Sequence, residues 1–367
     1  MRNADDVNAQ ALPDAADALM QPSSDRAAWI PEEMEADKVW LHNFTDRELT
    51  EIHEAVENVE RERLDFLDID RDAFPLPHFT ARLTEVRNEL LYGRGFVLFR
   101  GLDIDHTNRR RAALAFWGIS MHLGDVALSQ NANGHALGHV YDLGQTRENP
   151  LQRGPYSREA IPFHCDWCDL TGLCCLNPAK QGGLNSIMSS VTVYNEMLEH
   201  SPDLVEALTH PIYRDRRGET PQGMDEWYAI PVFNVFDGWF SANLEPAMTD
   251  SVERFDEVPK KSTLEREAIA EIQRICDEKH LSMDFLPGDI QFINNHTTFH
   301  SRSAYEDYTE VDRKRHLFRI WLKCFDGRPL SHWFYDRNGP QGTVDRPGGI
   351  VRSDTVLTAP LVPSVHR

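Results

Sequence analysis

A histidine and an aspartate placed two residues apart could form part of a metal site. His164 and Asp166 flank Cys165 in the stretch Pro162–Trp167. Residues i and i+2 of a β-strand face the same side, so the imidazole and the carboxylate would project together while Cys165 points away. These groups are two of the three ligands in the 2-His-1-carboxylate triad, which binds non-haem Fe(II) and leaves metal positions open for a cosubstrate and O2. Taken alone, such a pair is more often an ordinary surface or core pair.

Two arginines downstream of a second histidine indicate the kind of cosubstrate that such a metal would bind. The segment Pro287–Asn295 predicts a turn followed by a strand, and it leads to His300. Further on, Arg315 and Arg319 would share one face of an otherwise apolar strand. Burying an arginine there is costly without an anion, and a guanidinium matches a carboxylate through two parallel hydrogen bonds. A dicarboxylate cosubstrate that chelates the metal at one end would supply that anion at the other.

Together these features resemble the taurine dioxygenase / clavaminate synthase-like family of Fe(II)- and 2-oxoglutarate-dependent oxygenases. The similarity covers residues 79–323, about two-thirds of the chain. Each motif is weak by itself, and the specificity lies in their combination. The motifs are Gly95–Leu102, His164-x-Asp166, Gly182-Gly183 with the serine-containing strand after it, Pro287-Gly288-Asp289, Asn295–His300 with Arg302, and Arg315 with Arg319.

The resemblance implies a fold, a metal and a cosubstrate. The family has a distorted double-stranded β-helix, or jelly-roll, core with helices packed outside. By matching position, His164, Asp166 and His300 would be the ligands of Fe(II). Arg319 would pair with the distal carboxylate of the cosubstrate 2-oxoglutarate, and Arg315 would be a second contact near it.

The sequence departs from the family pattern after the Gly-Gly pair. The family usually has Thr or Ser there to hydrogen-bond 2-oxoglutarate, whereas this chain has Asn185 followed by Ser186. An asparagine amide can also donate a hydrogen bond, so we expect Asn185 and Ser186 to keep this role. Some related enzymes that halogenate lack the carboxylate ligand. Because Asp166 is present, halogenation is disfavoured.

The candidate substrate contacts lie in the irregular segment 124–160. Long irregular segments within compact domains are often functional loops, and the family tends to build its substrate mouth from this region. The candidates are Gln130, Asn131, His135, His139 and Tyr141. The primary substrate itself cannot be read from the sequence, because substrate preference in the family lies in variable loops.

Composition excludes several classes of function. The 367 residues include 38 Lys and Arg against 59 Asp and Glu, a net charge of −21, which argues against binding to nucleic acid or anionic lipid. No apolar run of about 18 residues predicts a membrane span. Residues 1–28, rich in Ala, Asp, Asn and Ser, predict a disordered tail and lack a secretion signal. We therefore expect a cytoplasmic protein with a small-molecule substrate and O2 as partners, and a homo-oligomer is possible.

The cysteines allow a second interpretation of the same region. Cys165, Cys168, Cys174 and Cys175 crowd into eleven residues, a poor layout for disulfides in a secreted chain. Zinc is the alternative, but on a strand Cys165 points away from His164. We interpret these cysteines as reduced core residues.

The pattern of elements predicts one α+β domain over residues 29–367, with the iron ligands within 160–325. A capping box at Thr45 and Glu48 begins a helix that should reach about Leu64. The other expected helices cover residues 79–91, 108–123, 192–209 and 263–279. The expected strands cover residues 96–99, 161–176, 185–191, 229–235, 239–243, 289–294 and 315–324. Helices first and short strands later indicate an N-terminal helical layer around a β core.

The function expected from these observations is oxidation of a small organic molecule by a non-haem Fe(II)- and 2-oxoglutarate-dependent dioxygenase, with release of succinate and CO2. Hydroxylation, desaturation and ring closure begin from the same iron chemistry, so the sequence does not separate them. A catalytically idle jelly-roll binding protein is the alternative from another class. An intact triad together with Arg319 argues against it, because an idle relative has little reason to keep them.

Overall fold

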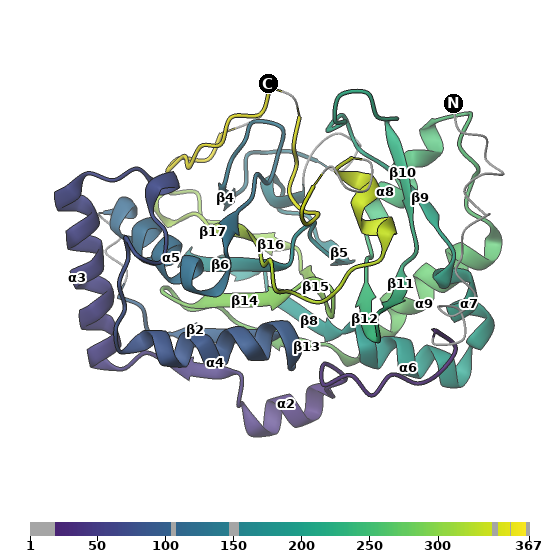
Figure 1. The fold of residues 1–367 in the computed structure, drawn as a ribbon, viewed down its shortest axis with the longest axis horizontal. Coiled ribbons are helices and arrows are strands. Elements are labelled where there is room, and N and C mark those ends of the chain that lie inside the picture. Colours follow the sequence, from purple (N-terminus) through teal and green to yellow (C-terminus); the bar gives the residue numbers. More distant parts are fainter. Residues whose placement is uncertain (1–18, 104–107, 147–153, 340–343, 353, 365–367) are drawn as a thin grey trace.

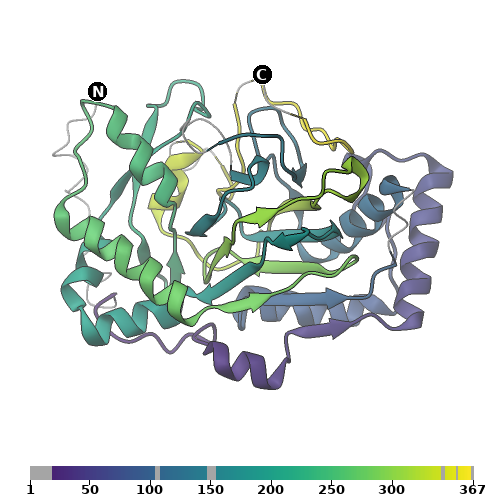
Figure 2. The same ribbon diagram turned by 180° about the vertical axis from the view of Figure 1, so that it is seen from behind.

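The computed structural model describes residues 19–103, 108–146, 154–339, 344–352 and 354–364, in which helices and strands are mixed (Figures 1 and 2). The principal helices are α2 (Pro31–Asp37), α3 (Asp46–Glu62), α4 (Phe79–Tyr92), α5 (Arg109–Leu123), α6 (Ser190–His200), α7 (Pro202–Thr209), α8 (Pro246–Ser251) and α9 (Thr263–Lys279). None of the described helices combines the length and apolar character needed to cross a membrane.

The larger sheet has seven strands. Its order is β1 (Leu41–Asn43), β2 (Phe96–Arg100), β14 (Ile290–Asn294), β6 (Leu170–Asn177), β17 (His316–Lys323) and β3 (Val126–Ala127), with β4 (Leu137–Val140) also paired to β17. All neighbours are antiparallel except β1 and β2. The strands of the sheet centre are buried along nearly their whole length, and most of their residues are apolar.

The second sheet has four strands in the order β13 (Leu281–Met283), β8 (Asn185–Ser189), β15 (Thr298–Arg302) and β5 (Ile161–His164). In this sheet His300 on β15 lies directly opposite His164 at the end of β5. Three two-stranded sheets complete the β structure: β9 (Ile212–Asp215) with β10 (Trp227–Ile230), β11 (Phe233–Phe236) with β12 (Trp239–Ala242), and β7 (Gln181–Gly182) with β16 (Tyr305–Glu306).

Helices pack at both ends of the β structure (Figures 1 and 2). Helices α3, α4 and α5 share one apolar core with β2, β6, β14 and β17, which is the predicted N-terminal helical layer. Helices α6, α7 and α9 share a second core with β5, β8 and β15. Thr45 and Glu48 form the predicted capping box at the start of α3, which ends at Glu62.

Two predicted elements are each divided in the structure. The helix expected over residues 192–209 is two helices, because Pro202 begins α7 and Ser201 stands at the junction. The strand expected over residues 161–176 ends at His164 and resumes at Leu170. Asp166 therefore lies in the connection between β5 and β6, not on a strand as the i, i+2 argument assumed.

The predicted disordered tail over residues 1–28 is wrong for its last ten residues. The side chains of Leu19 and Ala27 are buried, and Asp25 forms an ion pair with Arg328. The backbone of Ser23 also receives and donates hydrogen bonds with the amide of Asn195. Residues 1–18 lie outside the described residues, so the prediction stays untested there.

Candidate metal and cosubstrate site

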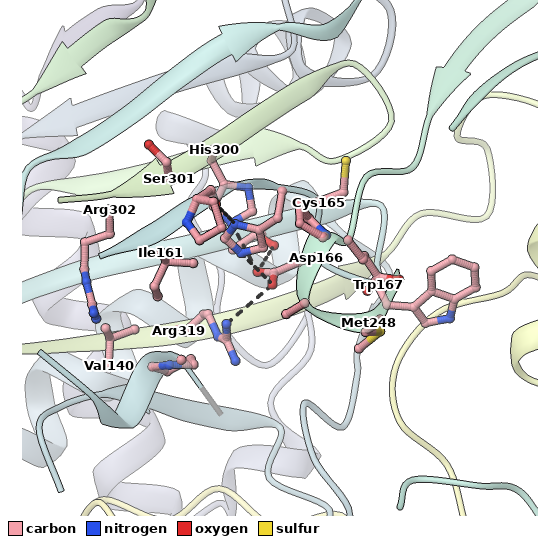
Figure 3. Close-up of a pocket in the computed structure, with 18 of the residues that line it drawn as sticks. Val140, Ile161, Cys165, Asp166, Trp167, Met248, His300, Ser301, Arg302 and Arg319 are labelled. Carbon is pink, nitrogen blue, oxygen red and sulfur yellow. Dashed lines mark hydrogen bonds and ion pairs between the residues drawn. The ribbon is translucent and has the colours of Figure 1, made fainter. Parts of the chain in front are cut away.

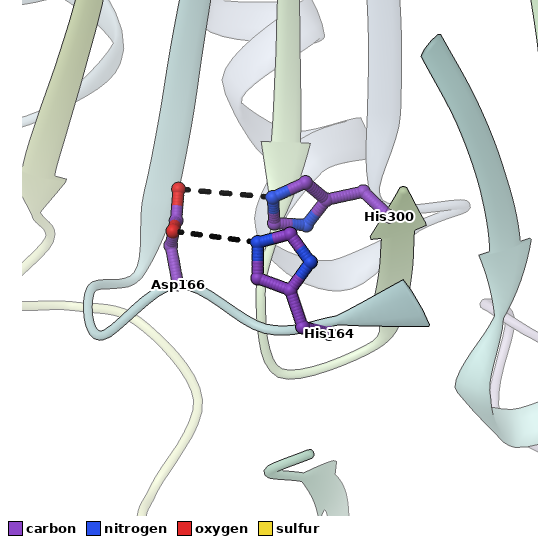
Figure 4. A group of neighbouring side chains, drawn as sticks. All are labelled: His164, Asp166 and His300. Atoms are coloured by element: carbon purple, nitrogen blue, oxygen red, sulfur yellow. Dashed lines mark ion pairs between the residues drawn. The ribbon is translucent and has the colours of Figure 1, made fainter. Parts of the chain in front are cut away.

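His164, Asp166 and His300 converge on one point (Figure 4). One ligand atom from each lies within 4.8 Å of the others. The Nε2 atom of His164 is 3.9 Å from Asp166 Oδ1, and that of His300 is 3.7 Å from Asp166 Oδ2. Two imidazole nitrogens and a carboxylate on one side of a point, with the other side open to a cavity, match the facial donor set of non-haem Fe(II).

The two histidines face Asp166 in the form that a metal requires. His164 Nδ1 donates a hydrogen bond to the Pro162 carbonyl at 2.9 Å, which fixes the proton on Nδ1 and leaves the Nε2 lone pair available. Burial lowers the pKa of His300 to about 3, and the neighbouring His164 adds to that lowering. His300 is therefore neutral near pH 7 and able to donate a lone pair.

Asp166 is buried and held by several donors. Thr171 Oγ1 and Trp321 Nε1 donate to its Oδ2 at 3.0 and 2.8 Å, and its backbone N–H donates to Asn295 Oδ1 at 2.9 Å. Burial opposes ionisation of Asp166, but the positive charge of Arg319 holds its pKa below the usual range. The carboxylate is thus charged and oriented before any ligand arrives.

Arg315, which directly precedes β17, and three residues of that strand line the cavity beside this triad. Alternate residues of a strand point to the same side, and Arg315, Leu317, Arg319 and Trp321 all line the same cavity. Trp321 and Arg319 lie at the metal end, where Arg319 Nη1 is 3.5 Å from Asp166 Oδ1. Arg315 lies four residues back along the strand, about 13 Å away by backbone rise, with Leu317 between.

The guanidinium of Arg315 lies over the ring of Tyr305 and beside Gly183. Its Nη2 donates to the Gly183 carbonyl at 3.4 Å, while its buried Nη1 has no hydrogen-bond partner among the described residues. Gly183 has φ of 70°, and a Cβ there would lie 2.9 Å from Arg315 Nε, so the Gly-Gly pair makes room for this side chain. An orphaned guanidinium nitrogen in a cavity wall is a site for an anion.

The cavity has a volume of about 490 Å³, within the usual range for small-molecule sites (Figure 3). Apolar side chains such as Val140, Ile161 and Met248 line parts of it. Its ionisable lining beyond the two histidines is rich in arginine: Arg217, Arg302, Arg315, Arg319, Arg337, Asp166, Glu219, Glu245 and Asp250.

Of the two residues expected to replace the family's Thr or Ser, only one lines the cavity. Asn185 begins β8 and lines the cavity together with Arg315, and its Nδ2 donates to Gln291 Oε1 at 2.5 Å. Ser186 points elsewhere, and its hydroxyl pairs with that of Ser282 at 3.3 Å. Neighbouring residues of a strand face opposite sides, which explains the division.

None of the expected substrate contacts is among the described residues that line this cavity. Gln130 bonds to Arg319, and the Asn131 side chain closes its own turn by accepting from the Asn133 and His135 backbone N–H groups. His139 pairs with His316, and the ring of Tyr141 packs edge-on against His316. The part of the expected loop at residues 147–153 lies outside the described residues.

The cysteines do not take part in the cluster of metal-binding side chains found among the described residues. All six are buried and unpaired. Cys168 Sγ accepts a hydrogen bond from Asn295 Nδ2 at 3.2 Å, and burial raises the pKa of the Cys165 thiol to about 12. These features favour the core interpretation over zinc.

Sequence reasoning missed the residues that orient Asp166. Trp321 carries a recoverable signal, since it follows Arg319 by two and so shares its face on a strand. Thr171 gives no such signal, because its contact with Asp166 depends on how the chain turns between β5 and β6.

Comparisons with known proteins agree with the geometry. Residues 60–321 match the model of the "Taurine catabolism dioxygenase TauD, TfdA family". FR-33289 synthase of Streptomyces rubellomurinus is 29% identical over 316 residues, which are 84% of this chain and 93% of that protein. A taurine hydroxylase-like protein of Stachybotrys chartarum is 25% identical over 307 residues, 81% of this chain and 78% of that protein.

Solved structures show the same fold. Asparagine oxygenase in complex with Fe(II), 3-hydroxyasparagine and succinate has a TM-score of 0.62 at 17% identity, covering 77% of this chain and 93% of that chain. The non-haem iron oxygenase OrfP in complex with Fe and alpha-ketoglutaric acid has a TM-score of 0.58 at 18% identity, with the same coverage. Because the family model spans well over half of its length, this chain belongs to the TauD/TfdA family of Fe(II)- and 2-oxoglutarate-dependent dioxygenases, which are oxidoreductases.

Proposed function

We propose that His164, Asp166 and His300 hold the Fe(II) of this dioxygenase in a double-stranded β-helix core formed by the two larger sheets. The convergence of the three ligand atoms at the cavity is the single observation that carries this assignment. When bound, the iron with 2-oxoglutarate supplies the O2 activation that amino-acid side chains cannot provide. The chain's own residues bind the cosubstrate, keep Asp166 ionised and exclude water.

We further propose that 2-oxoglutarate lies along β17 with its far carboxylate at Arg315 rather than at Arg319. Arg319 is already beside the iron ligand Asp166, whereas two methylene groups separate the far carboxylate from the chelating end. Leu317 lies between the arginines and suits those methylenes. The unpartnered Arg315 Nη1, with Asn185 in the same cavity, would receive the far carboxylate. Arg319 would then face the chelating end.

The substrate that fits this cavity is a small organic molecule with an anionic group. With Fe(II) and dianionic 2-oxoglutarate in place, the described ionisable residues of the lining still leave net positive charge. The apolar side chains of Val140 and Ile161 on one side of the cavity, with Met248 on the other, suit a short carbon skeleton. Oxidation of a C–H bond of that skeleton, with release of succinate and CO2, is the proposed reaction.

The test is a substrate screen with anaerobic protein loaded with Fe(II) and 2-oxoglutarate. Small carboxylates, sulfonates, phosphonates and phosphates would be compared with their amides or esters. We expect an anionic compound to perturb the metal-to-ligand absorption band and, after O2 is admitted, to accelerate succinate release. If neutral analogues act as well as the anions, the proposed substrate class is wrong.

A further inference from the structure

Gln130 contacts the cationic end of the metal site without touching the cavity. Its Oε1 accepts a hydrogen bond from Arg319 Nε at 2.7 Å. Its Nε2 donates to the Arg319 carbonyl at 2.8 Å and to the Ala136 carbonyl at 2.9 Å. Only 1% of Gln130 is exposed, so all these bonds are shielded from water. The side-chain amide of Gln130 is therefore hydrogen-bonded both to the backbone carbonyl and to the guanidinium of Arg319.

The neighbouring strand is shaped to admit this amide. Gly138 on β4 pairs with Arg319 on β17, and a Cβ at Gly138 would lie 2.4 Å from Gln130 Oε1. Any larger residue at 138 would push the amide away from Arg319. The absence of a side chain at Gly138 is thus an independent sign that the Gln130–Arg319 contact is built into the sheet.

The turn that carries Gln130 is held by a hydrogen bond of its own and by hydrogen bonds from the C-terminal segment. Gln130 N–H donates to the His135 carbonyl at 2.9 Å, which closes the turn. The C-terminal segment braces it, because Ile350 N–H donates to the Ser129 carbonyl and Thr358 N–H to the Gly134 carbonyl, each at 2.8 Å. The position of the Gln130 amide is therefore set by the backbone contacts of its turn and does not depend on the Arg319 side chain.

The consequence concerns the direction in which Arg319 presents its charge. With Nε engaged by Gln130, the guanidinium plane is fixed and Nη1 lies 3.5 Å from Asp166 Oδ1. Without Gln130, rotation about the side-chain bonds would let the guanidinium leave Asp166. We propose that Gln130 is a positioning residue, which holds Arg319 toward the metal ligand and the chelating end of 2-oxoglutarate. This inference rests on the proposed placement of the cosubstrate.

The experiment compares four single variants and one double variant of the full chain by anaerobic calorimetric titration of 2-oxoglutarate into Fe(II)-loaded protein. Gln130→Met removes the amide at nearly constant volume, and Gly138→Ala displaces it. We expect each to weaken 2-oxoglutarate binding about tenfold, the loss typical of one misplaced charge-assisted contact. Asn234→Leu is the matched control, because Asn234 is also a buried amide bonded to a carbonyl and a hydroxyl, but outside the cavity. It should lower the melting temperature and leave the affinity unchanged.

The fourth variant, Arg319→Lys, separates positioning from support of the fold. If Gln130 acts through Arg319, adding Gln130→Met to Arg319→Lys should cause little further loss of affinity. Equal losses in both backgrounds, or unchanged affinity in Gln130→Met with a lowered melting temperature, would show that Gln130 only supports the fold. If the wild-type protein binds no 2-oxoglutarate in the presence of Fe(II), the proposed function fails instead, so the two failures are distinguishable.

Discussion

At the residue scale, Arg319 on β17 and Arg315 just before that strand differ in what surrounds them. Arg319 has partners for its charge within the protein, namely Gln130 and Asp166. Arg315 is more deeply buried than Arg319 but keeps an unpartnered Nη1. A buried cation that is satisfied before ligand binding gains less from an anion than one that is not. The far carboxylate of 2-oxoglutarate should therefore depend more on Arg315.

The first prediction is that Arg315→Ala weakens 2-oxoglutarate binding by about 30- to 1000-fold, the range for losing one partner of a charge-assisted pair worth about 2–4 kcal/mol. Iron stoichiometry should be unchanged, because Arg315 is not a ligand. Anaerobic calorimetric titration measures the affinity, and circular dichroism confirms that the variant is folded. A large loss in Arg319→Ala combined with a small one in Arg315→Ala would restore the assignment expected from the sequence.

The sequence was sufficient to select candidate site residues but not to predict which neighbours each of them contacts. His164, Asp166 and His300 could be chosen because their motifs occur together with Arg315 and Arg319, although each motif is weak by itself. Gln130 was expected to contact the substrate, whereas its amide bonds Arg319 and Ala136 and it is not among the residues that line the cavity. An amide near a site can bind a ligand or a neighbour, and the sequence alone does not decide between them. The relative roles of Arg315 and Arg319 depend likewise on where Asp166 lies after β5 ends.

At the element scale, a C-terminal segment is tied to the connection between β5 and β6. Asp169 in that connection is buried and receives two hydrogen bonds from Arg346, at 2.7 and 2.6 Å. His296 Nε2 and Cys324 N–H also lie at hydrogen-bond distance, each at 2.8 Å. Asp169 therefore anchors the chain three residues beyond Asp166, the proposed metal ligand.

The second prediction follows from this anchor. Arg346→Met leaves Asp169 buried without its strongest partner, and such losses cost about 3–5 kcal/mol of unfolding free energy. Urea unfolding measures the change. The double variant Asp169→Asn with Arg346→Met should recover part of it, because no unpaired charge remains. If Arg346→Met is as stable as the wild type, the ion pair does not anchor the segment.

The boundaries of elements were predictable where local signals are strong. The capping box at Thr45 and the glycines after Tyr92 fixed the limits of α3 and α4 closely. The break between β5 and β6 was not predicted, because no proline or glycine separates His164 from Leu170. The chain leaves the four-stranded sheet at His164, which places Asp166 beside both histidines, and this tertiary arrangement has no local signature.

At the scale of the whole molecule, the protein carries several buried histidines whose pKa values are lowered. Burial lowers the pKa of His139 to about 4 and that of His316 to about 2. They form a chain in which His316 Nε2–H donates to His139 Nδ1 at 2.8 Å and His139 Nε2–H to the Pro360 carbonyl at 2.9 Å. A second proton on His139 would face the His316 donor, so the fold requires both rings neutral.

The third prediction gives the resulting pH dependence. In the unfolded chain these histidines become protonated near pH 6.5, but in the folded chain only near pH 4 or below. Their contribution to the free energy of unfolding is therefore fully present above about pH 6.5 and is lost as the pH is lowered toward 4. Each such histidine contributes a slope of about 1.4 kcal/mol per pH unit. In metal-free protein, urea unfolding between pH 7.5 and 5 should show a shallower slope for His316→Phe. An unchanged slope would mean that His316 titrates alike in both states.

The measurement that tests the central claim most directly is the anaerobic titration of Fe(II) and then 2-oxoglutarate into wild-type protein and Asp166→Ala. The account predicts one Fe(II) and one 2-oxoglutarate per wild-type chain, with a metal-to-ligand absorption band that requires both. The Asp166→Ala variant should stay folded, because the apolar core is unchanged. It should lose tight Fe(II) binding and the absorption band. A folded Asp166→Ala protein that binds iron and 2-oxoglutarate as the wild type does would contradict the assignment of the metal site.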